Sequence, residues 1–153
     1  MPIEYRRGDI FASKADWLVA PVNCVGVMGA GLAKQFKLKI PGLEDRYKAV
    51  CREQLIAPGE PFRLFMNDGS PHIVLFPTKN HWRNPSKLEW IDRGLLEFAH
   101  TFRNATRIQI AVPPLGCGLG GLHWDDVKPL IEKHLGSLEV TVLVYEPGPI
   151  KRS

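Results

Sequence analysis

Short apolar runs alternate along the chain with segments whose apolar residues recur at helical spacing. An apolar run of about four to eight residues is typical of a buried strand, and a 3.6-residue period is typical of an amphipathic helix. The pattern therefore predicts an α/β domain in which helices pack on a central sheet. The predicted strands are 3–6, 17–21, 62–66, 72–76, 108–112 and 140–145.

Four helices are predicted between these strands, and the clearest covers 87–103, where apolar residues follow helical spacing. Ser86 followed by Glu89 predicts a capping box at its start, with each side chain bonding a free backbone N–H. The other predicted helices are 30–37, 43–56 and 125–134. Because proline is tolerated in a helix only in its first turn, Pro129 predicts that the last helix begins close to Asp125 or Asp126.

The segment Asn67-Asp68-Gly69-Ser70 separates two predicted strands with residues that tolerate positive φ. It predicts a hairpin turn, and a hairpin joins antiparallel strands. We therefore expect a mixed sheet rather than a purely parallel one.

The chain has 153 residues, enough for one hydrophobic core, so we expect one domain over 1–147 with a frayed tail over 148–153. A formal charge of +4 is too small to indicate a polyanion partner. No apolar run is long enough for a membrane span, and the N-terminus has no signal-peptide core. We expect a soluble, cytoplasmic monomer without membrane contact. Three scattered cysteines predict neither a disulfide framework nor a metal site.

Two glycine-rich segments, 26–32 and 116–121, each join a predicted strand to a predicted helix. Unhindered backbone N–H groups and a helix N-terminus converge in such a loop and can bind a phosphate. One loop alone would be a tight turn, but two at neighbouring strand ends favour a diphosphate between them. Neither dinucleotide nor P-loop fingerprints occur, which disfavours a hydride-transfer enzyme and a P-loop ATPase.

Several motifs in this order resemble the macrodomain family, whose members bind ADP-ribose, and the resemblance covers nearly the whole chain. It is sharpest for the branch of DarG-type DNA ADP-ribosyl glycohydrolases, the antitoxins that oppose DarT-type toxins. It implies a three-layer α/β/α macrodomain with a central mixed β-sheet. The motifs are Gly8-Asp9-Ile10, Val22-Asn23-Cys24-Val25-Gly26-Val27-Met28-Gly29-Ala30-Gly31-Leu32-Ala33, Phe76-Pro77-Thr78-Lys79-Asn80-His81-Trp82-Arg83 and Pro113-Pro114-Leu115-Gly116-Cys117-Gly118-Leu119-Gly120-Gly121-Leu122.

The resemblance implies a ligand contact for each motif. Asp9 and the Ile10 backbone would bind adenine, and Tyr145 would pack on its face, unless it is an ordinary strand aromatic. Asn23 would bind the distal ribose and take part in catalysis, although asparagine at a strand end is often only a turn former. Backbone amides would hold the diphosphate and the distal ribose, from Gly29, Ala30, Gly31, Leu32, Gly116, Cys117, Gly118, Leu119 and Gly120.

The resemblance also implies that Lys79, directly after a predicted buried strand, is the catalytic lysine. As a neutral amine it would attack the anomeric carbon, and as an ammonium it would polarise the ribose or protonate the leaving base. Glycohydrolases that act on proteins carry an aspartate where this sequence has Gly120. We expect the glycine to open space beside the distal ribose, and Asp125 and Asp126 to belong to a helix start.

His81-Trp82-Arg83 follows the lysine and would bind single-stranded DNA, because a base can stack on tryptophan beside a cation. Alternatively, Trp82 covers the edge of the next helix. The sequence thus predicts hydrolysis of ADP-ribose from nucleobases of single-stranded DNA, without a cofactor and with a DarT-type toxin as partner. Two alternatives stay open, a non-catalytic ADP-ribose reader and a deacylase of ester-linked ADP-ribose. A cysteine hydrolase is disfavoured because no base accompanies Cys24, Cys51 or Cys117.

Overall fold

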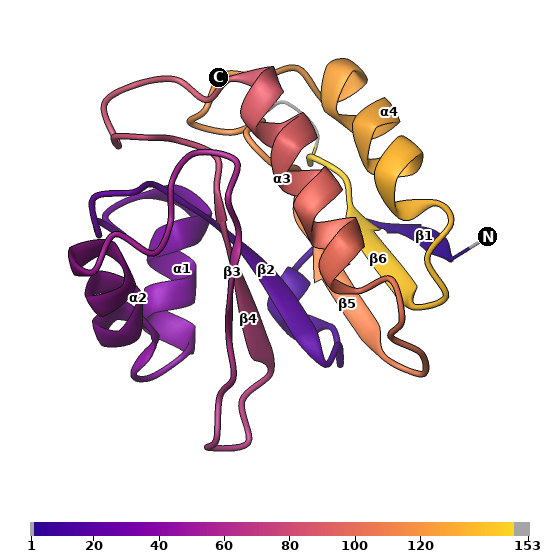
Figure 1. Ribbon diagram of the computed structural model, residues 1–153, viewed down its shortest axis with the longest axis horizontal. Helices are drawn as coiled ribbons and strands as arrows, with labels where there is room; N and C mark the ends of the chain where they lie inside the picture. Colours follow the sequence, from indigo (N-terminus) through magenta and orange to yellow (C-terminus); the bar gives the residue numbers. More distant parts are fainter. Residues whose placement is uncertain (1, 149–153) are drawn as a thin grey trace.

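The computed structural model describes residues 2–148, so residues 149–153 of the predicted tail lie outside the described part. Six strands form one sheet in the order β1-β6-β5-β2-β4-β3 (Figure 1). Neighbouring strands are parallel throughout β1-β6-β5-β2-β4, and β3 pairs antiparallel with β4 at one edge. The predicted mixed sheet is confirmed. The strands are β1 (Ile3–Arg6), β2 (Trp17–Val22), β3 (Phe62–Leu64), β4 (His72–Pro77), β5 (Gln109–Val112) and β6 (Thr141–Tyr145).

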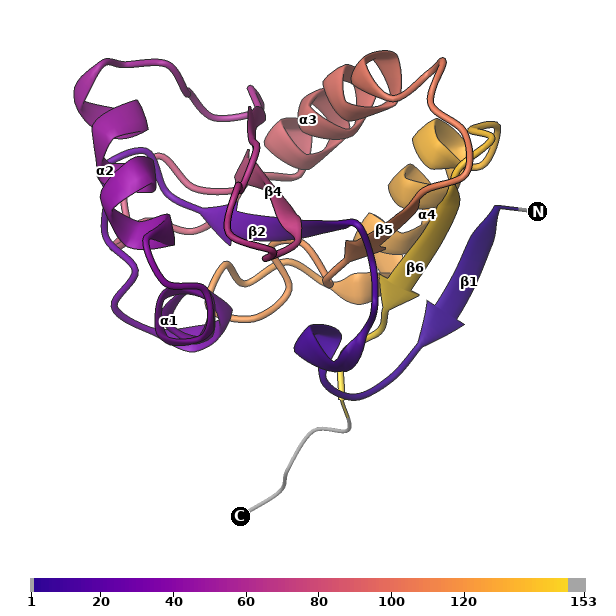
Figure 2. The same cartoon turned by 90° about the horizontal axis from the view of Figure 1, so that it is seen from below.

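Helices cover both faces of the sheet, which confirms the predicted three layers. Figure 2 shows α1 and α2 on one side of the sheet and α3 and α4 on the other. Within residues 2–148, no helix is long and apolar enough to cross a membrane. The helices are α1 (Gly31–Lys39), α2 (Leu43–Arg52), α3 (Leu88–Thr101) and α4 (Trp124–Leu135), with a 3-10 turn at Ile10–Ala12 after β1.

The alternation of side chains along β2 explains why helices pack on both faces of the sheet. Trp17 and Val19 belong to the core under α3 and α4, and Leu18 and Ala20 belong to the core under α1 and α2. Successive side chains of a strand point to opposite faces, so a strand that is apolar throughout needs a layer on each side. This layering leaves the carboxyl ends of the parallel strands, and the loops that follow them, along one edge of the molecule.

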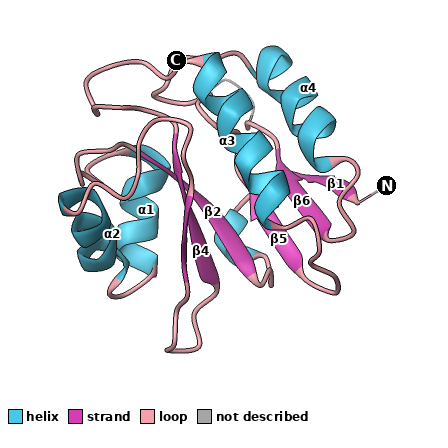
Figure 3. Cartoon of the chain, in the orientation of Figure 1, coloured by secondary structure: helices cyan, strands magenta, loops and turns pink. Residues whose placement is uncertain are grey.

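The predicted hairpin is confirmed between β3 and β4, and its loop projects beyond the other strands (Figure 3). Gly69 has φ +87°, and the Ser70 N–H donates to Asp68 Oδ1 at 3.0 Å. The strand predicted over 62–66 ends earlier, at Leu64, because the Met66 N–H donates to the His72 ring at 2.9 Å instead of to the ladder.

One predicted helix boundary is wrong, and so is the expected place of Pro129. The helix predicted over 43–56 ends at Arg52, because Gln54 has a left-handed φ of +55° and the Leu55 N–H turns back to Val50 O. The last helix starts at Trp124, within one residue of the predicted start, but Pro129 lies beyond its first turn and not in it. Pro129 and Asp125 are exposed, so water can bind the carbonyl that the missing N–H leaves free.

The predicted capping box at Ser86 is also wrong. The N-cap of α3 is Lys87, and no side chain caps this helix. Ser86 is buried, and its Oγ has no hydrogen-bond partner in the part of the chain that the structure describes. The reason is that Ser86 faces the loop after β5, where its N–H donates to Gly120 O at 3.0 Å.

Candidate functional site

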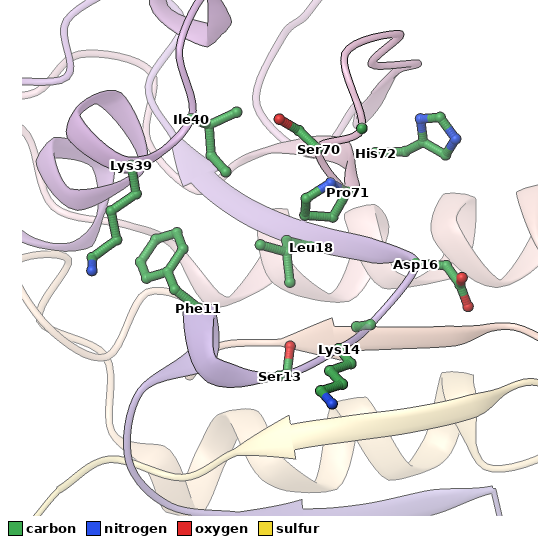
Figure 4. Close-up of a pocket in the computed structure, with 12 residues that line it drawn as sticks. Phe11, Ser13, Lys14, Asp16, Leu18, Lys39, Ile40, Ser70, Pro71 and His72 are labelled. Atoms are coloured by element: carbon green, nitrogen blue, oxygen red, sulfur yellow. The ribbon is translucent and has the colours of Figure 1, made fainter.

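A cavity of about 1000 Å³ lies at the carboxyl ends of β2 and β4, where both glycine-rich loops meet. Its size suits a ligand of the bulk of a nucleotide. A second cavity, of about 630 Å³, lies at the opposite ends of β2 and β4 beside Ser13 and His72 (Figure 4). Of the residues predicted to bind or react, the larger cavity brings together Asn23, Gly29, Ala30, Gly31, Leu32, Lys79, Trp82, Arg83, Gly116, Gly118, Leu119 and Gly120.

Asn23 organises the first glycine-rich loop. Its side chain is 7% exposed, and Oδ1 accepts the N–H groups of Val25, Gly26 and Val27 at 3.0, 3.1 and 3.3 Å. Its Nδ2 donates to Val27 O at 2.8 Å, and the Tyr47 hydroxyl lies 2.7 Å from Oδ1. The oxygen is therefore fully engaged in the protein, and the second N–H of the amide is what Asn23 has left for a ligand.

The start of α1 supplies free amides to the same cavity. Ala30 is the N-cap without a side-chain bond, and the first N–H bonded within the helix belongs to Lys34, which donates to Ala30 O. In the part of the chain that the structure describes, the N–H groups of Gly31, Leu32 and Ala33 have no acceptor. Such a helix start favours an anion.

The second glycine-rich loop lines the same cavity and also carries free amides. Gly116 and Gly121 have φ of +73° and +81°, and the Leu122 N–H donates to Gly116 O at 2.9 Å, which closes the loop. Within residues 2–148, the N–H groups of Gly118, Leu119 and Gly120 have no acceptor. Leu119 reaches the first loop, because a Cβ built on Gly31 would lie 3.3 Å from its Cδ1. The two predicted phosphate loops thus lie side by side.

Gly120 does not open space in the cavity, contrary to the sequence-based expectation. A Cβ at this position would overlap the Ser86 Oγ and would lie 2.6 Å from Gly116 O. The side-chain direction at position 120 therefore leads into the protein, toward Ser86. On this backbone, a carboxylate at position 120 would not fit.

Lys79 is half-buried on the wall of the cavity, directly after β4. The strand end is fastened to β2, because Thr78 N–H donates to Val22 O and Cys24 N–H donates to Asn80 O, both at 3.0 Å. Lys79 Nζ donates to Trp82 O at 3.4 Å. In residues 2–148, Lys79 forms no ion pair, and no aspartate or glutamate lines the cavity.

Trp82 and Arg83 form the rim beside this lysine. The Trp82 side chain is 46% exposed, so it does not cover a helix edge in the manner of a core residue. The Arg83 guanidinium carbon lies 4.8 Å from the centroid of the indole ring, within cation–π range. The His81 ring lies 5.3 Å from that indole and accepts the Arg83 N–H at 3.1 Å. His81 therefore shapes the turn without lining the cavity.

Four other predicted residues do not line the cavity in the described structure. Asp9 is exposed and caps the 3-10 turn, where its Oδ1 accepts the Phe11 N–H at 2.9 Å; Ile10 is buried beside it. Both lie at the same sheet edge as the cavity, because they follow β1. Tyr145 is buried in the core under α1 and α2, and Cys117 is half-buried with its Sγ 3.5 Å from Leu115 O.

The three cysteines are poor nucleophiles. Burial, followed by the nearby Cys51 and Glu60, raises the pKa of Cys24 to about 11. Burial, followed by the charge of Asp126, raises the pKa of Cys117 to about 11, and burial also raises the pKa of Cys51. All three are thiols at neutral pH, whereas the thiolate is the reactive form.

Two residues of the site were missed in the sequence. Tyr47 has the spacing of a core residue in α2, and the sequence holds no signal that its hydroxyl reaches the Asn23 loop. Ser86 matches a helix cap, and this local pattern hides its contact with Gly120.

Comparison with known proteins places these features in a family. Residues 19–131 match the family described as Macro domain. The chain is 41% identical over 149 residues to a DNA ADP-ribosyl glycohydrolase of Mycobacterium tuberculosis, and the match covers 95% of this chain but 42% of that protein. The chain thus spans less than half the length of this curated relative.

Two solved structures are similar throughout the chain. One is the macrodomain of Mycobacterium tuberculosis DarG, with a TM-score of 0.86, 41% identity and coverage of 95% of this chain and 98% of that one. The other is Thermosipho africanus DarTG in complex with ADP-ribose, with a TM-score of 0.87, 34% identity and coverage of 97% and 43%. These matches confirm the resemblance inferred from the glycine-rich loops and from the motif around Lys79. With its sheet order, its paired amide loops and a family match over most of its length, the chain belongs to the macro domain family.

Proposed function

We propose that the chain binds ADP-ribose in the cavity and hydrolyses the N-glycosidic bond between ADP-ribose and a nucleobase of single-stranded DNA. It would thereby reverse DNA ADP-ribosylation, as the antitoxin to a DarT-type toxin in the cytoplasm. One observation carries the proposal: Lys79 lies on a cavity wall that also holds two sets of free amides, in a chain 41% identical to a DNA ADP-ribosyl glycohydrolase.

The two loops would hold the diphosphate. The free amides at the start of α1 and those of Gly118 to Gly120 come from separate segments, and each set can bind one anionic group. Asp9 would bind the adenine amino group, since its Oδ1 already accepts one N–H and Oδ2 is left as an acceptor. Asn23 would contribute chiefly by holding the first loop in shape, with one amide N–H for the distal ribose.

Lys79 would act on the glycosidic bond. The ammonium would give a proton to the leaving nucleobase as the bond from the anomeric carbon to the base nitrogen breaks and water bonds to that carbon. The proton that the water loses would restore the ammonium, and the products are free ADP-ribose and the unmodified base. The route through a neutral amine forms a lysyl adduct that water must later resolve. Both routes need water to attack the anomeric carbon, and no carboxylate lines the cavity in residues 2–148 to activate it. The ammonium route reaches the products in one step without a covalent adduct, and it is the route that we propose.

Trp82 and Arg83 would hold the DNA. An exposed indole beside the catalytic lysine offers a face on which a neighbouring base can stack, and Arg83 offers a cation for a phosphate. The stacked base would direct the modified nucleotide toward Lys79. This rim favours DNA over a protein substrate, which has no base to stack.

The proposal is tested with a single-stranded oligonucleotide that a DNA ADP-ribosyl transferase has modified. Incubation with the protein should release free ADP-ribose and restore the unmodified oligonucleotide, as followed by mass spectrometry. A peptide with ester-linked ADP-ribose serves as the competing substrate. Tight binding of ADP-ribose without release from DNA would identify a reader instead, and release from the peptide alone would identify a deacylase.

The two routes for Lys79 are separated in a single turnover. Protein in excess is mixed with the modified oligonucleotide, quenched in acid and analysed by mass spectrometry. The ammonium route predicts unmodified protein at every time point. A transient increase by the mass of one ADP-ribosyl group on Lys79 would show that the amine is the nucleophile.

A further inference from the structure

Ser86 is buried beneath the second glycine-rich loop without a hydrogen-bond partner for its hydroxyl. The residue is 5% exposed, and its Oγ has no hydrogen-bond partner within the described residues. Buried polar groups are nearly always paired, and leaving one unpaired costs free energy. The Ser86 hydroxyl is therefore available to a partner that comes within reach when the neighbouring loop changes its arrangement.

The loop surrounds this hydroxyl closely. The Ser86 N–H donates to Gly120 O at 3.0 Å, and the Oγ occupies the space that a side chain at position 120 would take. A Cβ built on Gly116 would lie 3.3 Å from the Ser86 Cβ. Gly116 and Gly120 also line the cavity. One layer of glycine backbone therefore separates the Ser86 hydroxyl from the site of the ligand.

An anion in the cavity would change what the hydroxyl faces. Within the described residues, the N–H groups of Gly118, Leu119 and Gly120 have no acceptor, and they would turn toward the anion. A planar peptide that turns its N–H to one side turns the attached carbonyl to the other side. Here the other side is the interior, where the Ser86 Oγ lies, so a loop carbonyl would gain a hydroxyl donor.

We propose that Ser86 is a positioning residue for the second glycine-rich loop, and that its hydroxyl finds its hydrogen-bond partner in the loop backbone when a diphosphate is bound. The loop would then have two arrangements, and the Ser86 hydroxyl would favour the one with amides turned toward the ligand. The same residue follows the Trp82–Arg83 rim in the chain, so it ties that rim to the phosphate loop. This inference rests on the proposed binding of ADP-ribose.

The test uses Ser86→Ala, and Ser13→Ala provides a matched control. Ser13 holds the second buried Oγ without a partner within the described residues, and it lies at the smaller cavity, at the opposite ends of β2 and β4 (Figure 4). Removing either orphan hydroxyl should leave the Tm unchanged or raise it by about 2–4 °C. Both variants are compared with the unaltered protein by thermal unfolding and by calorimetric titration with ADP-ribose.

The proposal predicts that Ser86→Ala weakens ADP-ribose binding about five-fold, the equivalent of one neutral hydrogen bond, while Ser13→Ala leaves it unchanged. With saturating ADP-ribose, the backbone amides of 118–120 should exchange with solvent faster in Ser86→Ala than in the unaltered protein. Ser86→Cys keeps the shape with a weaker donor and should bind with intermediate affinity.

Equal affinity of Ser86→Ala and the unaltered protein would overturn the inference. A fall in Tm that accompanies the loss of affinity would also overturn it, since it would show a merely structural hydroxyl. If the unaltered protein does not bind ADP-ribose at all, the proposed function fails, which is a different result from equal affinities.

Discussion

Replacing Asn23 by alanine should destabilise the protein as well as weaken ligand binding, because this side chain holds a loop through five contacts. Its Oδ1 accepts three backbone N–H groups and lies 2.7 Å from the Tyr47 hydroxyl, and its Nδ2 donates to Val27 O. Alanine removes all five contacts at once.

The magnitude follows from which groups lose every partner. The Tyr47 hydroxyl keeps the Asn23 carbonyl oxygen, 2.8 Å away, and the amides of Val25 and Val27 are part-buried and can bind water. The Gly26 N–H is buried and would be left unpaired, at a cost of about 1–3 kcal/mol. With smaller losses at the other contacts, we expect a destabilisation of about 2–4 kcal/mol, or roughly 5–15 °C in Tm for a chain of this size.

Thermal and urea unfolding measure this effect, with Asn80→Ala as the control. Asn80 is exposed and lies at the end of the adjacent strand, where its backbone oxygen rather than its side chain accepts the Cys24 N–H. Asn80→Ala should change the Tm little. If Asn23→Ala shifts the Tm by less than about 2 °C yet abolishes turnover, Asn23 is a chemical participant and the organising role is refuted.

Three further predictions concern the ligand, the DNA and the cysteines. ADP-ribose should bind at least about tenfold more tightly than AMP by calorimetry, because AMP has no second phosphate for the second glycine-rich loop. Equal affinities would show that this loop is only a turn and binds no phosphate. Trp82→Ala should raise KM for a modified oligonucleotide about tenfold, since a stacked base contributes about 1–3 kcal/mol, and should leave the Kd of free ADP-ribose unchanged. Comparable losses of affinity for the oligonucleotide and for free ADP-ribose would show that Trp82 supports the fold. The pKa of Cys24 and of Cys117 is raised to about 11, so roughly one of these thiols in a thousand is ionised at pH 8. Iodoacetamide should therefore alkylate them slowly at pH 8 and faster as the pH rises toward 11. Rapid alkylation with loss of turnover at pH 7 would contradict these pKa values.

The sequence predicted the elements well because most of them follow from local pattern. Apolar runs located all six strands to within two residues, and Asn67-Asp68-Gly69-Ser70 located the hairpin. The end of α2 could not be predicted, because Gln54 adopts a positive φ that its residue type does not favour. The hairpin turn and the end of α2 both depend on local backbone conformation. The residue types of the hairpin indicate that conformation, whereas the glutamine at the end of α2 does not.

The site was predictable as a set of motifs and not as a set of contacts. The two glycine-rich loops and Lys79 do meet at one cavity, as the resemblance implied. The direction of the Gly120 side-chain position and the partner of Ser86 depend on how two loops far apart in the sequence pack together. No pattern within either loop carries that information, so Ser86 resembled a helix cap.

Release of ADP-ribose by a Lys79→Ala variant tests the proposed chemistry most directly. With Lys133→Ala, an exposed lysine of α4, as the control, turnover of the modified oligonucleotide and the Kd of free ADP-ribose are measured side by side. We predict a loss in kcat of at least about 100-fold, typical of a missing general acid, with the Kd unchanged because backbone amides hold the diphosphate. Full turnover by Lys79→Ala would contradict the assignment of Lys79 as the catalytic residue.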